Sequence, residues 1–432
     1  MRPMMQKKIL FSLVVAIALV ACASAAPTQE SLTEFALWLQ ANNVQSSANL
    51  GLFEGYGLAG VAREDVKEGD PIVKVPTSAL VSLTEVRTKV FADFEDWTGN
   101  QLEPLMVWLI LESGKESSPF KPYFGILPQE FPTHPIFWTA EELQELEGTG
   151  LVGAIASTKA ALQASFEHIS TKLVQPNPSV FKQEDFTFER YLWAYCVCVS
   201  RTWTVATEES RDLVLAPLAD MLNHKPGADL LHYSEDGTHV VVTATEDYAK
   251  GEQLFASYGN KSNYDLLALY GFVLENNPHD SLQINFQLNP SNLVQSIVEP
   301  LLRVADPSYK RLFIYKNTLP VTLLRLFRLN VMDFSELEFV DRALRGQAVG
   351  LSNELRAFRA AISSLAGMLQ AYPTTSEEDA AILARDDISE NLRAAVTLRK
   401  GQKDVLRVNI LAIGKLWESI LVSGKLFGDV PV

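Results

Sequence analysis

The sequence contains few cysteines. Only Cys22, Cys196 and Cys198 occur among 432 residues. Cys196 and Cys198 stand two residues apart in a stretch of helical periodicity, where their side chains point away from each other and rarely form a disulfide. A C-x-C pair without further cysteines cannot supply the four ligands of a structural zinc site. The sequence therefore predicts two buried free thiols and no structural metal.

Basic residues are outnumbered as well. The chain has 37 Lys and Arg against 52 Asp and Glu, which gives a net charge of −15. A nucleic-acid partner would require a basic face that neutralises phosphates, so the charge argues against this class. An acidic surface favours basic partners, such as lysine-bearing protein segments. The length and the apolar content of 47% are typical of a globular protein with two or three domains.

The apolar run near the N-terminus is too short to favour a membrane-spanning helix. It covers residues 9–20, after Lys7 and Lys8 and before the small residues 23–25. This order is typical of a signal peptide, which we place at residues 1–26, whereas a span needs about 20 apolar residues. We therefore expect entry into the secretory pathway or secretion. A membrane partner is expected only if this segment stays uncleaved.

Two other destinations are compatible with the same segment. Residues 19–22 fit a bacterial lipoprotein cleavage box. The Ala-Ser-Ala junction at residues 23–25 is similar to that of plastid proteins in algae with complex plastids, where phenylalanine and a transit segment normally follow. Ala26 and Pro27 follow here instead. Targeting to a plastid by way of the secretory pathway is therefore the alternative.

Apolar periodicity changes along the remaining chain. Alternating apolar residues and turn residues predict short strands within residues 51–76 and at residues 239–242 and 253–258. Helical periodicity dominates about residues 83–203 and nearly everything beyond Leu282. Capping boxes, in which a hydroxyl residue precedes Glu by three positions, predict helix starts at Ser31 and Thr375.

The most informative feature is the segment Asp-Met-Leu-Asn-His at residues 220–224. Tyr258 follows 34 residues after His224, and Tyr270 follows twelve residues after Tyr258, each before a glycine. Neither a metal site nor a Ser/His/Asp triad needs this set. It suits a site in which an amide and an imidazole hold a polar cofactor while tyrosine hydroxyls line a narrow channel.

Several strings give the chain a resemblance to SET-domain protein methyltransferases, in particular the Rubisco large-subunit lysine methyltransferase-like group. The core strings are PLADMLNH and EQLFASYGNKSNYDLLALYGF. The strings EGYGLAGVAREDVKEGDPIVKVP and YLWAYCVCVSRTW resemble the opening of these SET domains and the helix before their catalytic core. ENLRAAVTLRKGQKDVL resembles their substrate-binding domain, with one departure: Gln402 stands where an acidic residue usually precedes Lys403.

The resemblance implies an α+β fold in two domains. A SET domain with a largely β core would cover residues 29–275, with a helical insertion at about residues 83–203. In this fold the Asn-His segment and the tyrosine-bearing tail cross in a threaded, pseudoknot arrangement, a rare exception to simple chain topology. An all-helical substrate-binding domain would cover residues 282–425.

The resemblance also implies transfer of methyl groups from S-adenosylmethionine to a lysine of a protein substrate. This in-line displacement requires cofactor and amine to approach from opposite ends of one channel. Tyr56 would bind the cofactor through its backbone, and Arg201 would pair with its carboxylate. The cofactor-binding positions of the family correspond to Glu54, Tyr56, Arg201, Asn223, His224 and Phe272.

Tyr258 is the expected catalytic residue. A lysine amine with a pKa near 10.4 is neutral in only about one part in a thousand at pH 7.4, a deficit of roughly 4 kcal/mol. An apolar, aromatic-walled channel lowers that pKa, and the Tyr258 hydroxyl would orient the amine. The expected substrate-side residues are Ser200, Asp220, Tyr233 and Tyr270.

Plainer roles stay open for several of these residues. Tyr270 and Phe272 can belong to helix-end packing, Ser200 can cap a turn, and Asp220 can brace the Asn-His segment. Two other functions also stay open: histidine N-methylation, which occurs in a close branch of the family, and a catalytically silent SET fold that binds proteins. A silent module need not keep Asn223, His224 and Tyr258 together, which argues against the second.

Overall fold

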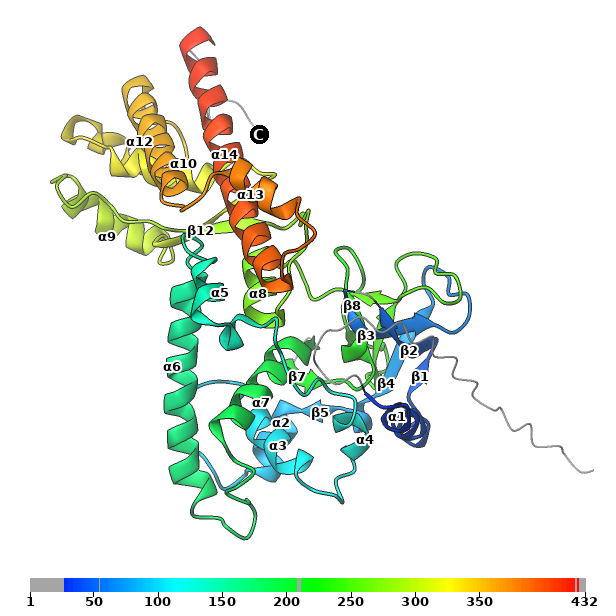
Figure 1. Cartoon of the computed structure of the whole chain (residues 1–432). Helices are drawn as coiled ribbons and strands as arrows, with labels where there is room; N and C mark the ends of the chain where they lie inside the picture. The colour runs from blue at the N-terminus through cyan, green and yellow to red at the C-terminus, as the bar shows by residue number, and fades with distance from the viewer. Residues whose placement is uncertain (1–26, 54, 208–210, 424–425, 427–432) are drawn as a thin grey trace, which may run out of the picture. The chain divides into compact units, whose positions relative to one another are not determined.

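The computed structural model of the chain describes residues 27–53, 55–207, 211–423 and 426. The expected signal peptide at residues 1–26 and the expected cofactor residue Glu54 lie outside the described residues. Within the described part, no helix is both long and apolar enough to cross a bilayer. The described residues divide into two compact units (Figure 1), the first within residues 27–130 and 168–259, the second within residues 131–167 and 260–426. The expected domain boundaries at residues 275 and 282 stay predictions.

The first unit contains several small sheets. Its strands are β1 (Gln45–Ser46), β2 (Ala48–Phe53), β3 (Gly57–Ala62), β4 (Pro71–Pro76), β5 (Val81–Ser82), β6 (Thr202–Ala206), β7 (Arg211–Leu215), β8 (Asn223–His224), β9 (His232–Tyr233), β10 (His239–Thr243) and β11 (Phe255–Ala256). They pair in the orders β1-β4-β10-β9, β2-β3, β5-β7-β6 and β8-β11. The pair β8-β11 is parallel, so its connection must cross over before the chain returns. This pair lays the two segments singled out in the sequence side by side.

The expected strand at residues 239–242 is confirmed by β10, but the strand expected at residues 253–258 is shorter. Only Phe255 and Ala256 pair with β8. The next amides leave the ladder: Ser257 N donates to Asp229 O at 2.8 Å, and Tyr258 N donates to the ring of His224. Hydrogen bonds outside the ladder, one to a backbone carbonyl and one to an imidazole, therefore end the strand where the site begins.

The helical elements of the first unit surround these sheets. They are α1 (Gln29–Ala41), η1 (Thr77–Ala79), α2 (Leu83–Glu85), η2 (Val86–Val90), α3 (Glu103–Ser113), α4 (Lys121–Phe124), η4 (Ser170–Val174), α7 (Phe188–Arg201) and η5 (Ala219–Met221). Helix α1 begins earlier than the box at Ser31 predicted, because the Thr28 hydroxyl accepts from Ser31 N at 3.1 Å. In α7, Cys196 and Cys198 are buried free thiols, as expected.

The second unit is mostly helical. Its elements are η3 (Pro135–Phe137), α5 (Ala140–Gln144), α6 (Leu151–Ile169, whose end belongs to the first unit), α8 (Asn263–Tyr270), β12 (Ser281–Asn285), α9 (Gln295–Ala305), β13 (Arg311–Tyr315), α10 (Val321–Asn330), η6 (Phe334–Phe339), α11 (Val340–Leu344), α12 (Leu351–Gln370), α13 (Ser376–Leu383) and α14 (Glu390–Ser423). The helical C-terminal region is confirmed, as is the capping box at Thr375.

One part of the second unit departs from the all-helical expectation. Strands β12 and β13 form an antiparallel ladder, with Leu282 opposite Ile314 and Ile284 opposite Leu312. These four side chains are buried, while their neighbours along each strand point outward. The alternation has period two, but it lasts only five residues in each strand and lies within helical sequence.

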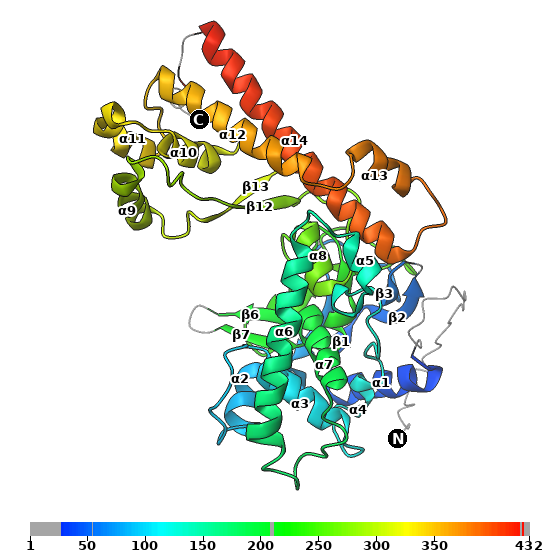
Figure 2. The same ribbon diagram turned by 60° about the vertical axis from the view of Figure 1, so that its left-hand side comes forward.

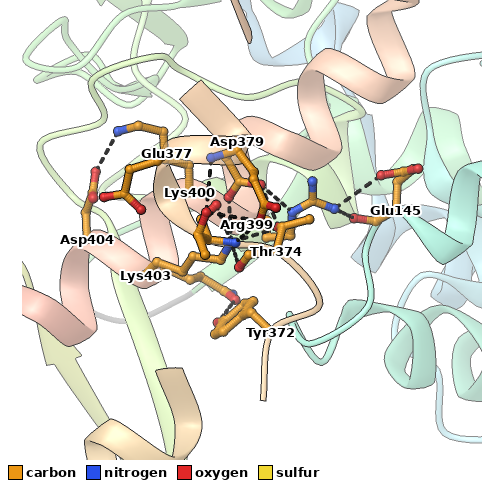
Figure 3. A network of polar contacts seen from close by, with 12 residues as sticks. Glu145, Tyr372, Thr374, Glu377, Asp379, Arg399, Lys400, Lys403 and Asp404 are labelled. Atoms are coloured by element: carbon orange, nitrogen blue, oxygen red, sulfur yellow. Dashed lines mark hydrogen bonds and ion pairs between the residues drawn. The ribbon is translucent and has the colours of Figure 1, made fainter. Parts of the chain in front are cut away.

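Helix α14 contacts several other elements of the second unit. It packs along α12 and α13, as Figure 2 shows. Asp379 of α13 accepts from Arg399 Nε at 2.9 Å and from Lys403 Nζ at 2.7 Å, both on α14 (Figure 3). The three side chains are at most 1% exposed. We call Asp379, Arg399 and Lys403 the α14 cluster.

Further contacts surround the α14 cluster. Arg399 Nη1 donates to Glu145 O at 2.9 Å, and Lys403 Nζ donates to Thr374 Oγ1 at 2.9 Å. Gln402 lies beside the cluster, where it accepts from Tyr372 Oη at 2.7 Å and donates to Thr149 O at 3.3 Å. A carboxylate could only accept. The hydrogen bond to Thr149 O therefore explains why this chain has an amide at position 402 instead of a carboxylate.

Candidate active site

The site is built on a strained turn. Leu218 has φ +79° and ψ −44°, although it is not glycine, and its side chain is buried. Such a conformation costs about 1–3 kcal/mol and is found mostly where structure around a functional site holds it. The turn leads through η5 into Asn223 and His224 of β8.

Tyr258 meets this segment through its backbone, its hydroxyl and its ring. Its amide donates to His224 Nδ1 at 3.0 Å, and its hydroxyl donates to Leu222 O at 3.0 Å. The rings of His224 and Tyr258 stack with centroids 5.1 Å apart and planes 22° apart. Because Nδ1 accepts, a neutral His224 carries its proton on Nε2. The structure thus brings the expected catalytic tyrosine against the expected cofactor segment.

Trp203 also belongs to this site, and the sequence reasoning did not identify it. Its ring contacts that of Tyr258 edge-on, with centroids 5.9 Å apart and planes at 81°. Trp203 lies on β6, two residues after Arg201, and is buried. An aromatic residue so close to a candidate cofactor arginine was the available signal.

Arg201 and Asp220 are neighbours in the structure. Arg201 Nη1 donates to Asp220 O at 2.8 Å and lies 3.8 Å from the Asp220 carboxylate. The Tyr123 hydroxyl of α4 donates to Asp220 Oδ2 at 2.5 Å. We call Tyr123, Arg201 and Asp220 the η5 cluster. The Asp220 side chain is fully buried within it, which favours the bracing role over contact with a substrate.

Three polar atoms in this region are buried without a hydrogen-bond partner among the described residues. They are Asn223 Nδ2, Arg201 Nε and Asp220 Oδ1. Buried polar groups in native proteins nearly always have partners, so unpaired ones call for an explanation such as a ligand or an ordered water. Two of the three are donors. The residues therefore fit a polar cofactor that offers acceptors, as a carboxylate and an adenine do.

The glycine turn between β2 and β3 reaches the same strands. Gly55 and Gly57 have φ of +74° and +69°, which side chains rarely tolerate. Tyr56, between them, is 54% exposed and places its ring 6.1 Å from that of Phe255. Phe255 pairs with Asn223 across the β8-β11 ladder. The turn and the Asn-His segment therefore lie near one another in the first unit.

Two expected substrate residues have simpler surroundings. The Ser200 hydroxyl donates to Cys196 O at 2.6 Å within α7, so it bonds back along its own helix rather than capping a turn, and its contact with a substrate stays a prediction. Tyr233 lies on β9, opposite Val240, and is partly buried. Burial, and then Asp212, raises the pKa of Tyr233. Its contribution to a channel stays a prediction.

Tyr270 and Phe272 lie in the second unit. Their ring centroids are 6.2 Å apart, on either side of Gly271, which ends α8 at φ +78°. A Cβ on Gly271 would lie about 3 Å from Thr133 and His134, so the turn requires glycine. Burial, and then Asp265, raises the pKa of Tyr270 to about 12, so its phenol stays protonated at neutral pH. Their expected roles in the wall and the cofactor pocket stay predictions.

Metal-ligating side chains do not gather in the described part of the chain: no group of three or more His, Cys, Asp or Glu could hold an ion there.

Comparison with known proteins adds two family matches. Residues 55–259 match the SET domain family, and residues 281–406 match the family described as Rubisco LSMT substrate-binding. The chain is 27% identical over 378 residues to an actin-histidine N-methyltransferase of Danio rerio, which covers 82% of this chain. The chain spans 62% of the length of that relative.

Two further similarities concern Rubisco methylation enzymes. The chain is 28% identical over 382 residues to the chloroplastic Rubisco large subunit N-methyltransferase of Pisum sativum, covering 82% of this chain and 75% of the relative. Its structure is similar to a crystal structure of the SET domain of LSMT bound to lysine and AdoHcy. The TM-score is 0.75 at 25% identity, over 90% of this chain and 92% of the other.

Proposed function

Because the chain belongs to the SET-domain family that carries a Rubisco LSMT-type substrate-binding domain, we propose that it transfers methyl groups from S-adenosylmethionine to a lysine side chain of a protein. The observation that carries the proposal is the contact of Tyr258 with His224 and Trp203, beside the unpaired donor of Asn223.

The cofactor would be held by groups of the first unit. Asn223 Nδ2 and Arg201 Nε are two buried donors near the site that lack a partner among the described residues, and Arg201 suits a carboxylate. When bound, S-adenosylmethionine supplies an electrophilic methyl group on a sulfonium. His224 would contribute to the same pocket, with the ring orientation that Tyr258 fixes.

The substrate amine would be received by aromatic groups. Trp203 and Tyr258 offer apolar ring surface, which disfavours the ammonium form and lowers the pKa of a lysine placed there. A phenol that donates its proton to Leu222 O can still accept a hydrogen bond from an amine. Tyr258 would thus hold the amine in line with the methyl group, and positioning of this kind supplies much of the rate.

Lysine is proposed before histidine as the target because the structure is similar to that of LSMT bound to lysine. An imidazole that attacks through one nitrogen carries a proton on the other, and this N–H needs an acceptor when it is buried. Indole is a donor only, so of these two aromatic residues only Tyr258 could supply that acceptor. An aliphatic lysine stem needs none.

Histidine methylation is the second candidate, and the relatives named actin-histidine N-methyltransferases favour it. Incubation of the full chain with isotope-labelled cofactor and a protein extract, followed by fragmentation mass spectrometry, separates the two. We expect label on lysine residues of basic segments, since the chain carries a net charge of −15. Label on histidine alone would replace the lysine proposal, and cofactor binding without any transfer would favour the binding module.

We also propose that residues 1–26 direct the chain into the secretory pathway, on the basic start, apolar run and small-residue junction of this segment. A fluorescent protein fused after Pro27 should appear in secretory compartments. Fluorescence in the cytosol would contradict the proposal, and fluorescence in a plastid would support the transit alternative.

A further inference from the structure

We infer that Tyr123 is a positioning residue for cofactor binding: its phenol fixes the Asp220 carboxylate, which holds the Arg201 guanidinium beside the Asn223–His224 segment. The inference rests on the proposed function, because Arg201 is one of the groups proposed to hold the cofactor. It adds a residue from the helical insertion, 97 positions away from Asp220.

Tyr123 is placed by packing before its hydroxyl acts. The side chain is fully buried, and its ring lies 6.2 Å from that of Phe35 and 6.0 Å from that of Phe124. The hydroxyl at the end of this apolar ring donates to Asp220 Oδ2 at 2.5 Å. A hydrogen bond to an ionised acceptor is stronger than a neutral one, so the rigid ring gives the carboxylate a fixed position.

This arrangement holds the guanidinium of Arg201 in place. Its Nη1 contacts three groups of η5: Asp220 O at 2.8 Å, Met221 Sδ at 3.3 Å and the Asp220 carboxylate at 3.8 Å. Its Nε is buried and has no partner in the described chain. A long side chain held at one end of the guanidinium loses little further entropy when a ligand binds the other end, and this preorganisation raises affinity.

The charges around Asp220 predict how this arrangement responds to pH. Burial raises the pKa of Asp220 to about 6, while Arg201 and the Tyr123 hydrogen bond act in the opposite direction. The Tyr123 phenol itself has a pKa well above its usual range, because of burial and then Asp220, and does not titrate here.

Other titratable groups near Asp220 are few. Cys198, on the same helix as Arg201, has a thiol whose pKa burial raises, so it stays neutral. Strand β3 brings no titratable residue to η5, and β4 brings only Lys74, whose charge acts on Asp236. Asn223 and His224, which follow in β8, add one imidazole near the site.

Cofactor affinity should depend on pH through Asp220. Acidification through about pH 6 protonates Asp220 and removes the ion pair with Arg201, so cofactor affinity should fall there. Tyr123→Phe deletes a hydrogen bond that stabilises the ionised carboxylate. The pKa of Asp220 should then rise further, and the loss of affinity should begin at a higher pH.

The test is calorimetry of S-adenosylmethionine binding to the full chain between pH 5.5 and 8. Tyr123→Phe should bind about tenfold more weakly than wild type at pH 7.5, the scale of one hydrogen bond to a charged group. The fall of affinity on acidification, which we call the acid limb, should begin at a higher pH than in wild type. Tyr191→Phe is the matched control: Tyr191 is another fully buried tyrosine of the first unit, with its ring 6.0 Å from that of Phe186. Its affinity and pH profile should equal those of wild type.

Asp220→Asn keeps an acceptor for Tyr123 but removes the charge. It should bind weakly and without the acid limb, and adding Tyr123→Phe should change its affinity by less than about twofold, because the two residues act through one another. If circular dichroism shows that Tyr123→Phe is unfolded, the Asp220→Asn variant still tests whether the Asp220 charge supports cofactor binding, because its affinity should then no longer fall on acidification.

Three outcomes would overturn the inference: wild-type affinity in Tyr123→Phe, weaker binding with an unshifted pH profile, or the same effect of Tyr123→Phe in the Asp220→Asn background. An acid limb that persists in Asp220→Asn would also overturn it. A wild-type chain that binds no cofactor would instead contradict the proposed function itself.

Discussion

The two units each contain a buried carboxylate beside an arginine, and the two carboxylates are satisfied differently. In the α14 cluster, both oxygens of Asp379 accept from cations, Arg399 and Lys403. In the η5 cluster, Asp220 has one phenol hydrogen bond, an arginine at 3.8 Å, and an oxygen without a partner among the described residues. Each cluster contains a buried atom without a hydrogen-bond partner among the described residues, since Arg399 Nη2 also lacks such a partner there.

The difference separates a structural from a functional use of buried charge. Buried ions are tolerated when they are paired, and removing one partner leaves an uncompensated charge. The α14 cluster follows this rule, so its expected contribution is the position of α13 on α14. Around η5, the unpaired donors of Arg201 and Asn223 are a cost that a bound ligand can offset. Breaking the first cluster should cost stability, and breaking the second should cost binding.

Asp379→Asn should give the largest effect. It removes the charge that two buried cations share, and losing one partner of a buried ion pair typically costs about 3–5 kcal/mol. Urea denaturation followed by circular dichroism measures this loss. Asp387→Asn is the control, because the Asp387–Arg385 pair is exposed and its loss should change stability little. Equal effects of the two changes would contradict the structural role of the α14 cluster.

Tyr258→Phe should act on turnover alone. The ring that stacks on His224 remains, while the hydroxyl proposed to orient the amine is lost. Turnover should fall about a hundredfold or more, the scale of one positioned polar group at a transition state, with fold and cofactor affinity nearly unchanged. Steady-state kinetics and calorimetry measure the two.

Tyr270→Phe is the companion to Tyr258→Phe. It should alter the number of methyl groups added, or substrate affinity, more than it abolishes transfer, which mass spectrometry of the product checks. Near-normal turnover of folded Tyr258→Phe would contradict the catalytic assignment and leave the family assignment intact.

Asn223→Ala should reverse the pattern of Asp379→Asn. Its Nδ2 has no partner among the described residues, so the free protein loses little when the amide is removed. Binding of S-adenosylmethionine should weaken roughly tenfold or more, because a donor proposed to face the cofactor is lost. Calorimetry with a parallel denaturation curve tests both halves. A large loss of stability with unchanged affinity would place Asn223 among the structural residues.

Gln402→Glu should give the smallest effect. The carboxylate can still accept from Tyr372, but it cannot donate to Thr149 O. One hydrogen bond contributes about 1 kcal/mol net, so the free energy of unfolding should fall by that order. Gln370→Glu, at the exposed end of α12, is the control. A stabilised Gln402→Glu would show that the added charge near Lys403 outweighs the lost donor.

Much of this organisation could be predicted from the sequence because its signals are local. Helix α14, the cap at Thr375 and the buried thiols of α7 follow from periodicity, capping chemistry and neighbours within a few residues. The Asn-His segment and Tyr258 were identified from short strings, and the structure brings them together.

The rest depends on contacts between distant segments. Tyr123 and Trp203 gain their significance from Asp220 and Tyr258, at 97 and 55 positions along the chain. Nothing in the sequence around Tyr123 distinguishes it from a core aromatic residue, and Trp203 is distinguished only by its place two residues after Arg201. The antiparallel ladder of β12 and β13 was missed because its alternation is five residues long in each strand. The start of α1 was placed too late because Thr28, and not Ser31, caps the helix.

The ladder between β8 and β11 contains only two residue pairs. So short a ladder has little stability of its own, and the two segments are also joined by the stack of Tyr258 on His224 and by the hydrogen bonds of Tyr258 to His224 and Leu222. Local opening of weakly held segments costs less free energy than global unfolding. Amide hydrogens of residues 255–258 should therefore exchange with solvent faster than those of the β4-β10 ladder, and slow down when a ligand adds its contacts. The contacts that orient the imidazole thus also oppose the local opening of the site.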